Sequence, residues 1–270
     1  MTRLLLAAAC VIVAGRTGGI GDRSKPAIQM LKTDSGVRFG VYGGKPAKPA
    51  PTFFVLAGGV EDSLKRAEFN EIGHILADKG YLSVALDLPC HGKDQVAGES
   101  GIAGWRTRLE KGQPLVEDFA KKASAVLDKL VKDGYTDAKK VGAAGTSRGG
   151  FMALHLAAAE PRIGWVVAFA PVTDLLAVSE FQGSKNDKPM RDLDLKKHAA
   201  RLAGRPVWLC IGNDDRRVST DEAILFTRRL VTAAAGKSKI VPVELHVMPT
   251  VGHTIHATAH EEAARWVMVR

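Results

Sequence analysis

The hydrophobic positions of this chain fall into short apolar runs separated by longer amphipathic segments. Most of the runs are continuous rather than alternating, which predicts strands buried on both faces. They cover residues 37–44, 52–59, 81–89, 139–147, 164–172, 205–214 and 243–249. Segments with helical spacing predict helices at 62–80, 114–134, 148–160, 219–236 and 254–269. This alternation indicates an α/β fold, with a mainly parallel central sheet and helices on both of its faces.

The beginning of the chain differs from the rest. One arginine precedes an apolar run at 4–14, which is too short to span a bilayer but suits the core of a signal peptide. We therefore predict a signal peptide at 1–15, a secreted or periplasmic protein, and no stable membrane insertion after cleavage. A buried first strand is the alternative. Cys10 lacks the usual leucine three residues earlier, which argues against a lipoprotein anchor. The polar, Gly-rich residues 16–36 are predicted to be a leader or linker, and 37–270 one domain.

Composition changes this picture little. The 270 residues are 46% hydrophobic and 25% charged, which is the ordinary balance of a globular protein. The formal net charge of +9 raises the question of a nucleic-acid partner. Basic and acidic residues alternate, however, as in "KKASAVLDKLVKDGYTDAKK" at 121–140. A polyanion site needs clustered basic residues, so we predict a solvated surface and no nucleic-acid binding.

Candidate chemistry begins in "VGAAGTSRGGFMALHL", residues 141–156. Gly145, Ser147 and Gly149 form the pattern G-x-S-x-G between a predicted strand and a predicted helix, the context of the nucleophile elbow of α/β-hydrolases. The two glycines keep side chains out of a crowded turn. The helix that starts at the serine offers free N–H groups, which favour negative charge there. The pattern predicts Ser147 as a nucleophile.

A serine nucleophile needs a base, and the base needs an orienting acid. In the elbow fold they follow in the order Ser, Asp or Glu, His. "GNDDRRVS" follows the strand at 205–214 and offers Asp214 or Asp215. "TVGHTIH" follows the strand at 243–249 and offers His253, while His256 and His260 come later, along the predicted helix.

With these motifs the chain resembles the α/β-hydrolase superfamily over roughly residues 37–270. The likeness is to single-domain esterases and to the hydrolase domain of prolyl-oligopeptidase-like enzymes. Members commonly carry G-x-x-D-x-x-V, and in "GNDDRRV" Asp215 fits this spacing whereas Asp214 does not. The family's usual Gly-His is matched by His253 and the glycine before it. The resemblance therefore implies a triad of Ser147, Asp215 and His253.

The resemblance also implies an oxyanion hole made of backbone N–H groups. One donor is the N–H of Arg148, which follows the nucleophile. The loop "LAGGVEDS" resembles the family's His-Gly-Gly loop, with Ala57 in place of the histidine. Gly59 is the expected second donor, with Gly58 or Val60 as neighbouring alternatives.

Three further features bear on the substrate. "LDLPCHGKD" at 86–94 resembles the family's D-x-P-G-x-G loop beside the pocket, with Cys90 in place of a glycine. His91 is a candidate substrate contact, although a brace for the loop is the alternative. Trp105 is a candidate for the mouth of the pocket, with a packing anchor as the alternative. The short, polar segment 173–204 is the expected cap.

No cofactor and no metal are expected. Asp87, Cys90 and His91 have no second ligand cluster to complete a metal site. The superfamily's strand order, 1-2-4-3-5-6-7-8, places the strand before Cys90 four positions from the strand of Cys210. At about 4.8 Å per strand this gap exceeds the reach of a disulfide, so two free thiols are expected.

These observations predict a serine hydrolase for esters with a small or medium acyl group, working through an acyl-enzyme on Ser147 with a small-molecule ester as its partner. A peptidase or amidase of the prolyl-oligopeptidase type is one alternative. A non-catalytic binding protein with the hydrolase fold is the other.

Overall fold

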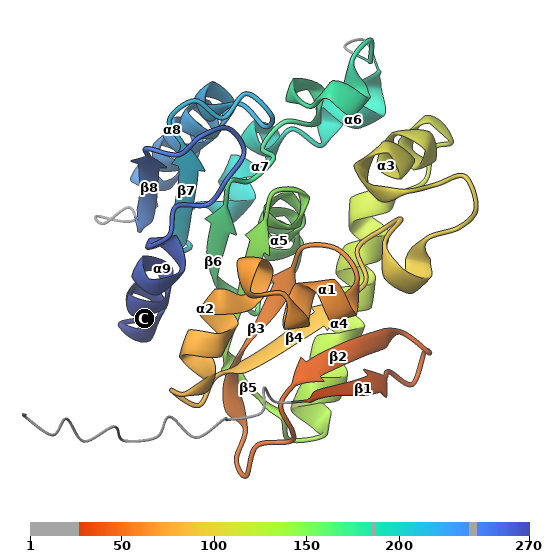
Figure 1. The fold of residues 1–270 in the computed structure, drawn as a ribbon, viewed down its shortest axis with the longest axis vertical. Coiled ribbons are helices and arrows are strands. Elements are labelled where there is room, and N and C mark those ends of the chain that lie inside the picture. Colours follow the sequence, from red (N-terminus) through yellow and green to blue (C-terminus); the bar gives the residue numbers. More distant parts are fainter. Residues whose placement is uncertain (1–26, 185–186, 238–241) are drawn as a thin grey trace, which may run out of the picture.

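A mixed sheet forms the centre of the computed structural model, which describes residues 27–184, 187–237 and 242–270 (Figure 1). Its order in the described residues is β1-β2-β4-β3-β5-β6-β7-β8. The sheet is parallel from β4 to β8, and β1 and β2 add an antiparallel edge. The strands are β1 (Ile28–Lys32), β2 (Arg38–Tyr42), β3 (Ala50–Leu56), β4 (Leu82–Leu86), β5 (Thr136–Thr146), β6 (Ile163–Phe169), β7 (Val207–Gly212) and β8 (Val243–Met248).

Helices cover both faces of this sheet. On one face lie α1 (Val60–Lys65), α2 (Ala67–Ala77) and α9 (Ala259–Met268). On the other lie α3 (Gly101–Glu110), α4 (Leu115–Lys132), α5 (Arg148–Ala159), α7 (Leu195–Leu202) and α8 (Thr220–Ala235). Shorter turns are η1 (Gly92–Asp94), η2 (Leu175–Ala177), η3 (Ser179–Phe181) and α6 (Lys188–Asp192).

The continuous apolar runs are explained by these two layers. In β3, Phe53 packs in the core beneath α1, α2 and α9, whereas Phe54 packs in the core of the opposite face. Neither ring is exposed. Because successive side chains of a strand point to opposite faces, a strand covered on both sides must be apolar at every position. The predicted α/β-hydrolase fold and its strand order are confirmed.

The predicted leader at 16–36 is wrong for its second half. Residues 28–32 form β1, which pairs antiparallel with β2 in the register Ile28 with Tyr42. A turn closes this hairpin: the Thr33 hydroxyl accepts a hydrogen bond from the Val37 N–H at 3.0 Å, and Gly36 has φ of +86°. None of the five residues of this edge strand is buried, so the strand is not marked by a continuous apolar run.

The predicted helix at 62–80 is two helices. Arg66, with φ −80° and ψ 121°, breaks the run between α1 and α2. The side chain of the buried Asn70 donates to the Leu64 carbonyl oxygen at 3.0 Å, at the end of α1. This bond partners a carbonyl that a continuous helix would have used, so the break is stabilised locally.

Two other boundaries differ from prediction. α3 forms at 101–110, where the hydrophobic pattern predicts no helix, and α9 begins at residue 259 rather than 254. The segment 173–204, predicted as a cap, includes α7, which packs on α5 and α8 as part of the helical layer. Its first part, residues 173–194, lies beyond the carboxyl ends of the strands and contacts α3 (Figure 1). We call these residues the cap segment, of which 185–186 are outside the described residues.

Cys90 and Cys210 are both buried and unpaired, as expected. The predicted signal peptide at 1–15 and Cys10 lie outside the described residues, so export stays a prediction. In the part of the chain that the structure describes, no helix has the length and apolar character needed to cross a bilayer.

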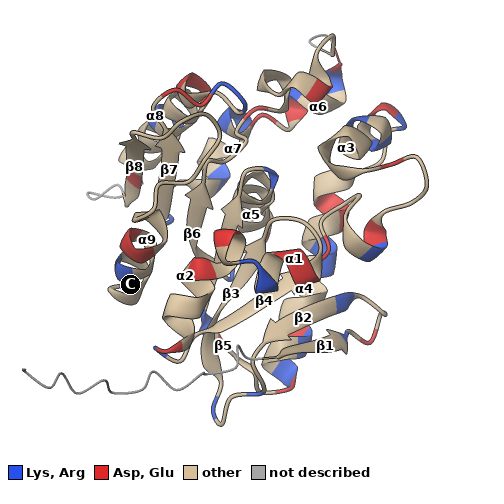
Figure 2. Cartoon of the chain, viewed as in Figure 1, with Lys and Arg blue, Asp and Glu red and all other residues tan. Residues whose placement is uncertain are grey.

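Basic and acidic side chains lie close together on several elements (Figure 2). α6 carries Lys188 and Arg191 beside Asp192, and α9 carries Arg265 beside Glu261. This interleaving agrees with a solvated surface, and the absence of a nucleic-acid partner stays a prediction.

Candidate active site

Ser147 occupies the sharp turn between β5 and α5. Its backbone has φ 56° and ψ −117°, a conformation that residues other than glycine rarely adopt. Three backbone hydrogen bonds hold it: Ser147 N–H donates to Phe169 O at 2.9 Å, and its carbonyl oxygen accepts from Phe151 at 3.2 Å and Val172 at 3.1 Å. The turn therefore presents a strained serine at the carboxyl edge of the sheet, as the motif predicts.

The two flanking glycines are required by close approach. A Cβ on Gly145 would lie 2.2 Å from the carbonyl oxygen of Gly149. A Cβ on Gly149 would lie 1.8 Å from the carbonyl oxygen of Leu56, at the end of β3. Any side chain at either position would push the turn away from β3, so the pattern G-x-S-x-G also fixes how near Ser147 lies to the loop that follows β3.

His253 joins the serine to a carboxylate. It lies in the loop after β8, where Gly252 takes a left-handed φ of +60°. The His253 Nδ1 atom is 2.7 Å from Asp215 Oδ2, and the Nε2 atom is 2.9 Å from Ser147 Oγ. Three residues from three separate loops, each predicted from the sequence, are thus brought into one hydrogen-bonded chain.

Asp215, rather than its neighbour Asp214, contacts His253. The Asp215 side chain is fully buried, and its Oδ1 accepts the backbone N–H groups of Arg217 at 2.9 Å and Val218 at 3.2 Å. Burial alone would raise the pKa of Asp215, but the hydrogen bond and charge of His253 and the two N–H donors outweigh it, so the pKa lies below its ordinary value. Asp214 is 67% exposed and pairs with Arg216.

The two later histidines do not take part in this hydrogen-bonded chain. His256 is in the loop before α9 and contacts the Thr258 hydroxyl at 3.0 Å. His260 is buried in α9, its ring centroid 4.3 Å from that of Phe169. Burial lowers the pKa of His260 to about 4. Neither ring bonds Ser147 in the described structure.

The loop after β3 offers one free backbone donor. The Gly58 N–H donates to Ser63 Oγ at 3.2 Å, and the Val60 N–H donates to Asp87 Oδ1 at 2.8 Å. Among the described residues the Gly59 N–H has no acceptor. Arg148 is the first residue of α5, where an N–H lacks a partner within the helix. The predicted pair of donors, Gly59 and Arg148, is therefore available.

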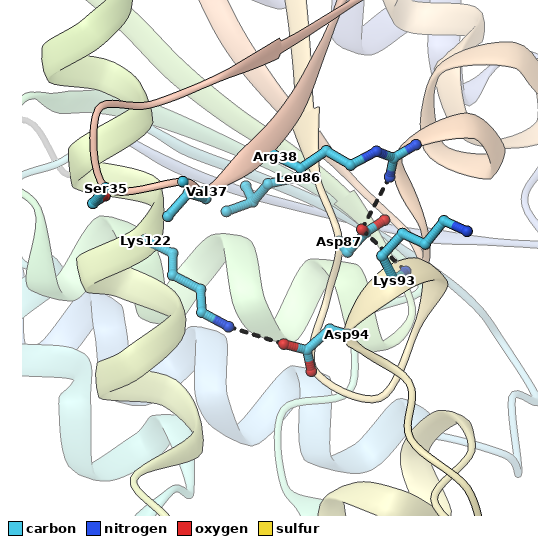
Figure 3. A pocket seen from close by; sticks show the side chains of 9 residues that line it. Ser35, Val37, Arg38, Leu86, Asp87, Lys93, Asp94 and Lys122 are labelled. Carbon is cyan, nitrogen blue, oxygen red and sulfur yellow. Dashed lines mark hydrogen bonds and ion pairs between the residues drawn. The ribbon is translucent and has the colours of Figure 1, made fainter.

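Asp87 bonds to the loop after β3 and also to Arg38 and Lys93, which Figure 3 shows beside it. Its Oδ2 accepts from Arg38 Nη1 at 3.1 Å and from the Lys93 backbone N–H at 3.2 Å, while Oδ1 holds the Val60 N–H. A hollow of about 340 Å³ opens beside it, where Lys122 pairs with Asp94 at 2.9 Å. Asp87 therefore ties the loops after β3 and β4 together behind the candidate donors.

A second cavity, of about 560 Å³, opens at Ser147, and we call it the Ser147 cavity. This volume lies within the range of small-molecule sites. Its walls come from α2, the elbow, the loops after β6 and β7, and the loop before α9. The lining residues are Glu68, Phe69, Thr146, Ser147, Arg148, Ala170, Arg217, His253, Thr254, Ile255, His256, Ala257 and His260.

Trp105 and His91 do not line this cavity. Trp105 is fully buried, with its Nε1 donating to Pro89 O at 2.6 Å and its ring 5.9 Å from that of Phe151. The prediction that it lines the mouth is wrong, because α3 packs the indole into the core. His91 bonds Pro89 O through Nδ1 at 2.8 Å. Burial, then the charge of Arg148, lowers the pKa of His91. Both residues brace the loop after β4.

Arg217 is a cavity residue that the sequence did not indicate. Its guanidinium bonds both carboxylate oxygens of Glu180 and the Ser179 hydroxyl, all in η3 of the cap segment. The partners are separated by 37 and 38 residues, so no local pattern marks them. In the described ranges, no three His, Cys, Asp or Glu side chains gather where they could hold a metal ion.

A family model described as "Prolyl oligopeptidase family" matches residues 68–267, about three quarters of the chain. The chain belongs to the prolyl oligopeptidase family. This family is a class of serine hydrolases that includes esterases and peptidases. The matched segment contains Ser147, Asp215 and His253, whereas Gly59 precedes it.

One curated relative in sequence is 2,6-dihydropseudooxynicotine hydrolase of Paenarthrobacter nicotinovorans. It is 29% identical over 152 residues, which cover 56% of this chain but only 37% of that protein. The chain thus matches little more than a third of this relative's length.

Solved structures share the fold. A putative dipeptidyl aminopeptidase IV from Bacteroides ovatus superposes with a TM-score of 0.68 at 18% identity, over 91% of this chain and 36% of that one. A cold-adapted esterase from an Arctic intertidal metagenomic library superposes with a TM-score of 0.65 at 19% identity. The superposition covers 90% of this chain and 92% of the esterase. TT1662 from Thermus thermophilus superposes with a TM-score of 0.67 at 17% identity, over 90% of this chain and 99% of TT1662. Identities this low establish the fold alone.

Proposed function

We propose that the protein is a serine hydrolase that cleaves carboxylic esters of small or medium acyl groups through an acyl-enzyme on Ser147. The observation that carries this proposal is the hydrogen-bonded chain from Asp215 through His253 to Ser147, which ends at the wall of the Ser147 cavity. A nucleophile, a base and an orienting acid in this arrangement perform acyl transfer on several unrelated folds.

In the first half-reaction Ser147 Oγ attacks the ester carbonyl carbon while His253 Nε2 takes the hydroxyl proton. Asp215 holds Nδ1–H of the ring and stabilises the imidazolium that forms. The carbonyl oxygen becomes an oxyanion, and the N–H groups of Gly59 and Arg148 are the donors we assign to it. When the tetrahedral intermediate collapses, His253 returns the proton to the leaving alcohol and the acyl group stays on Ser147.

In the second half-reaction a water molecule takes the place of the alcohol. His253 removes its proton as the water oxygen attacks the acyl carbon, and the same donors hold the second oxyanion. Collapse breaks the bond to Ser147 Oγ, which recovers its proton from His253, and the carboxylic acid leaves. All proton transfers pass through the Nε2 atom of His253, so the proposed cycle needs no cofactor.

Ester hydrolysis is favoured over peptide hydrolysis by the size of the site. The Ser147 cavity is bounded by the cap segment's partner Arg217 and by α2, and about 560 Å³ suits a small ligand rather than an extended peptide. The metagenomic esterase is also similar over nearly its full length, whereas the dipeptidyl aminopeptidase is matched over 36%.

The test is hydrolysis of 4-nitrophenyl esters from acetate to palmitate by the protein and by Ser147→Ala. We expect activity that peaks at short chains and falls at least 10⁴-fold in Ser147→Ala, with an unchanged circular dichroism spectrum.

Other outcomes separate the alternatives. Labelling of Ser147 by a fluorophosphonate without turnover of any ester would keep the nucleophile and favour a peptidase or amidase. Absence of both turnover and labelling would overturn the proposal and favour a binding protein with this fold.

A further inference from the structure

Arg148 contributes more than its backbone N–H to the site. Its side chain lines the Ser147 cavity, and a Cβ placed on Gly58 would lie 3.6 Å from Arg148 Nη2. The guanidinium therefore lies beside Gly58, in the loop that carries the Gly59 donor. It is mostly buried, and its Nε atom is inaccessible to solvent.

This buried guanidinium has no partner in the described protein. No hydrogen bond or ion pair of the Arg148 side chain forms there, and Nε is a buried donor without an acceptor. Asp62 and Glu180 act on it only at longer range. Burial, with the charge of Arg217, lowers the pKa of Arg148 despite these two carboxylates. An arginine nevertheless stays protonated, so a positive charge with unused donors faces the cavity.

Arg217, the other arginine of the cavity, is a useful contrast. Its guanidinium is bonded to both oxygens of Glu180 and to Ser179. Its charge is therefore compensated within the protein, and its donors hold the cap segment. A buried polar group without a hydrogen-bond partner destabilises the fold. Because the protein supplies partners for the Arg217 guanidinium and none for that of Arg148, the Arg148 donors are available to a ligand.

We propose that Arg148 forms an anionic subsite of the Ser147 cavity and that the substrate is an ester carrying a carboxylate, which the Arg148 guanidinium binds. This inference rests on the proposed ester hydrolysis and names its substrate class. A planar guanidinium binds a carboxylate through two parallel hydrogen bonds, which are stronger than hydrogen bonds between neutral groups.

The experiment compares matched esters in 0.15 M salt, where free charges act over only about 8 Å. Mono-4-nitrophenyl glutarate and 4-nitrophenyl pentanoate differ in a carboxylate on the acyl side. 3-Carboxy-4-nitrophenyl pentanoate differs from the latter in a carboxylate on the leaving group. With wild-type protein we expect one of the two carboxylate esters to have a higher kcat/KM than the neutral pentanoate. Which of the two is preferred shows whether the substrate carries its carboxylate on the acyl or the alcohol side.

The decisive variant is Arg148→Met, which keeps the length of the side chain and removes its charge. We expect the ratio of kcat/KM on the preferred carboxylate ester to kcat/KM on the neutral ester to fall about 10- to 100-fold, chiefly through the KM of the carboxylate ester. Arg216→Gln is the matched control, because it removes the same charge from an 86% exposed side chain on the neighbouring loop. It should leave the ratio of the two esters unchanged.

Several results would overturn the inference. An equal loss of kcat on charged and neutral esters would mean that the guanidinium serves the oxyanion instead. An unchanged ester ratio in Arg148→Met, or a wild-type preference for the neutral ester, would also contradict it. If Arg148→Met does not fold, Arg148→Lys and competitive inhibition of the wild type by glutarate against glutaramide decide the matter. Failure of the proposed function looks different, because then no ester is turned over at all.

Discussion

At the residue scale, the loop after β7 presents two adjacent carboxylates whose surroundings give them different roles. Asp215 is enclosed and accepts two backbone N–H groups as well as His253, which keeps it ionised. Asp214, one residue earlier, is in water beside Arg216. A carboxylate that must hold an imidazolium needs a fixed position and a low pKa, and the buried residue has both.

The two residues therefore predict opposite outcomes for the same chemical change. Asp215→Asn should lower kcat for a 4-nitrophenyl ester about 10⁴-fold, because an amide at this position stabilises the wrong tautomer of His253. Asp214→Asn should remain within about twofold of the wild type. Steady-state kinetics of both variants measures this. Comparable losses in the two would show that His253 is not oriented by Asp215.

The residues of the site differ in how far the sequence reveals them. Ser147 and His253 are recognisable because each follows a predicted strand and lies within two residues of a glycine that the turn requires. Trp105 was misassigned because its burial depends on the packing of α3 against Pro89 and Phe151, which no local pattern encodes. The open guanidinium of Arg148 is equally invisible in the sequence, since the absence of partners is a property of the folded chain.

At the scale of elements, α5 and α7 meet through a pair of histidines. His155 in α5 is 2% exposed and donates its Nε2–H to Leu193 O at 3.0 Å. Its ring centroid lies 4.8 Å from that of His198 in α7, and Arg201 of the same helix also acts on it. Burial, then the charge of these two neighbours, lowers the pKa of His155 to about 3. The helix pair therefore packs around a neutral imidazole.

This contact predicts acid lability. An unfolded histidine takes up a proton below about pH 6.5, whereas folded His155 stays neutral down to about pH 3. The unfolded state then binds more protons across this window, so the free energy of unfolding falls as the pH falls, by up to about 1.4 kcal/mol per unit. In His155→Gln the slope between pH 6 and pH 4, measured by urea denaturation, should be shallower.

The control is the same comparison of wild-type protein with His155→Gln near pH 8. His155 is neutral there in both the folded and the unfolded state, so the slopes should agree and any difference in stability reflects packing alone. Parallel curves from pH 8 to pH 4 would show that His155 does not carry the acid sensitivity.

Elements also show where periodicity fails as a guide. The run at 62–80 has one helical period, yet Asn70 stabilises a break within it by bonding the Leu64 carbonyl. The pattern predicts a leader where β1 forms, because an edge strand without buried residues is not a continuous apolar run. Both features depend on contacts between neighbouring elements, whereas the buried strands of the centre are marked in the sequence itself.

At the scale of the whole molecule, the sheet separates the two thiols. Cys90 packs in the core of the face covered by α3, α4 and α5, and Cys210 packs in the core beneath α9. Burial raises the pKa of Cys90 to about 11 and that of Cys210 to about 12. Both thiols are therefore unreactive as well as too far apart to pair.

We expect neither thiol to react quickly with dithionitrobenzoate in the folded protein, and both to react after unfolding in urea. The measurement uses a Cys10→Ser variant, so that the third cysteine does not contribute. The melting temperature should be the same with and without a reducing agent. One thiol missing from the unfolded count, or a reductant-sensitive melting temperature, would contradict the assignment.

The strand order has a consequence for the timing of synthesis. β5, β6, β7 and β8 lie side by side in chain order, so each strand leaving the ribosome meets an edge that the preceding strand has formed. The site is assembled in the same order, and its base arrives last, because His253 follows Ser147 by 106 residues. At about 5–20 residues per second, the nascent chain carries its serine for about 5–20 s before the histidine is made. Under the proposed mechanism, the nascent chain therefore has no base for Ser147 until the loop after β8 is in place.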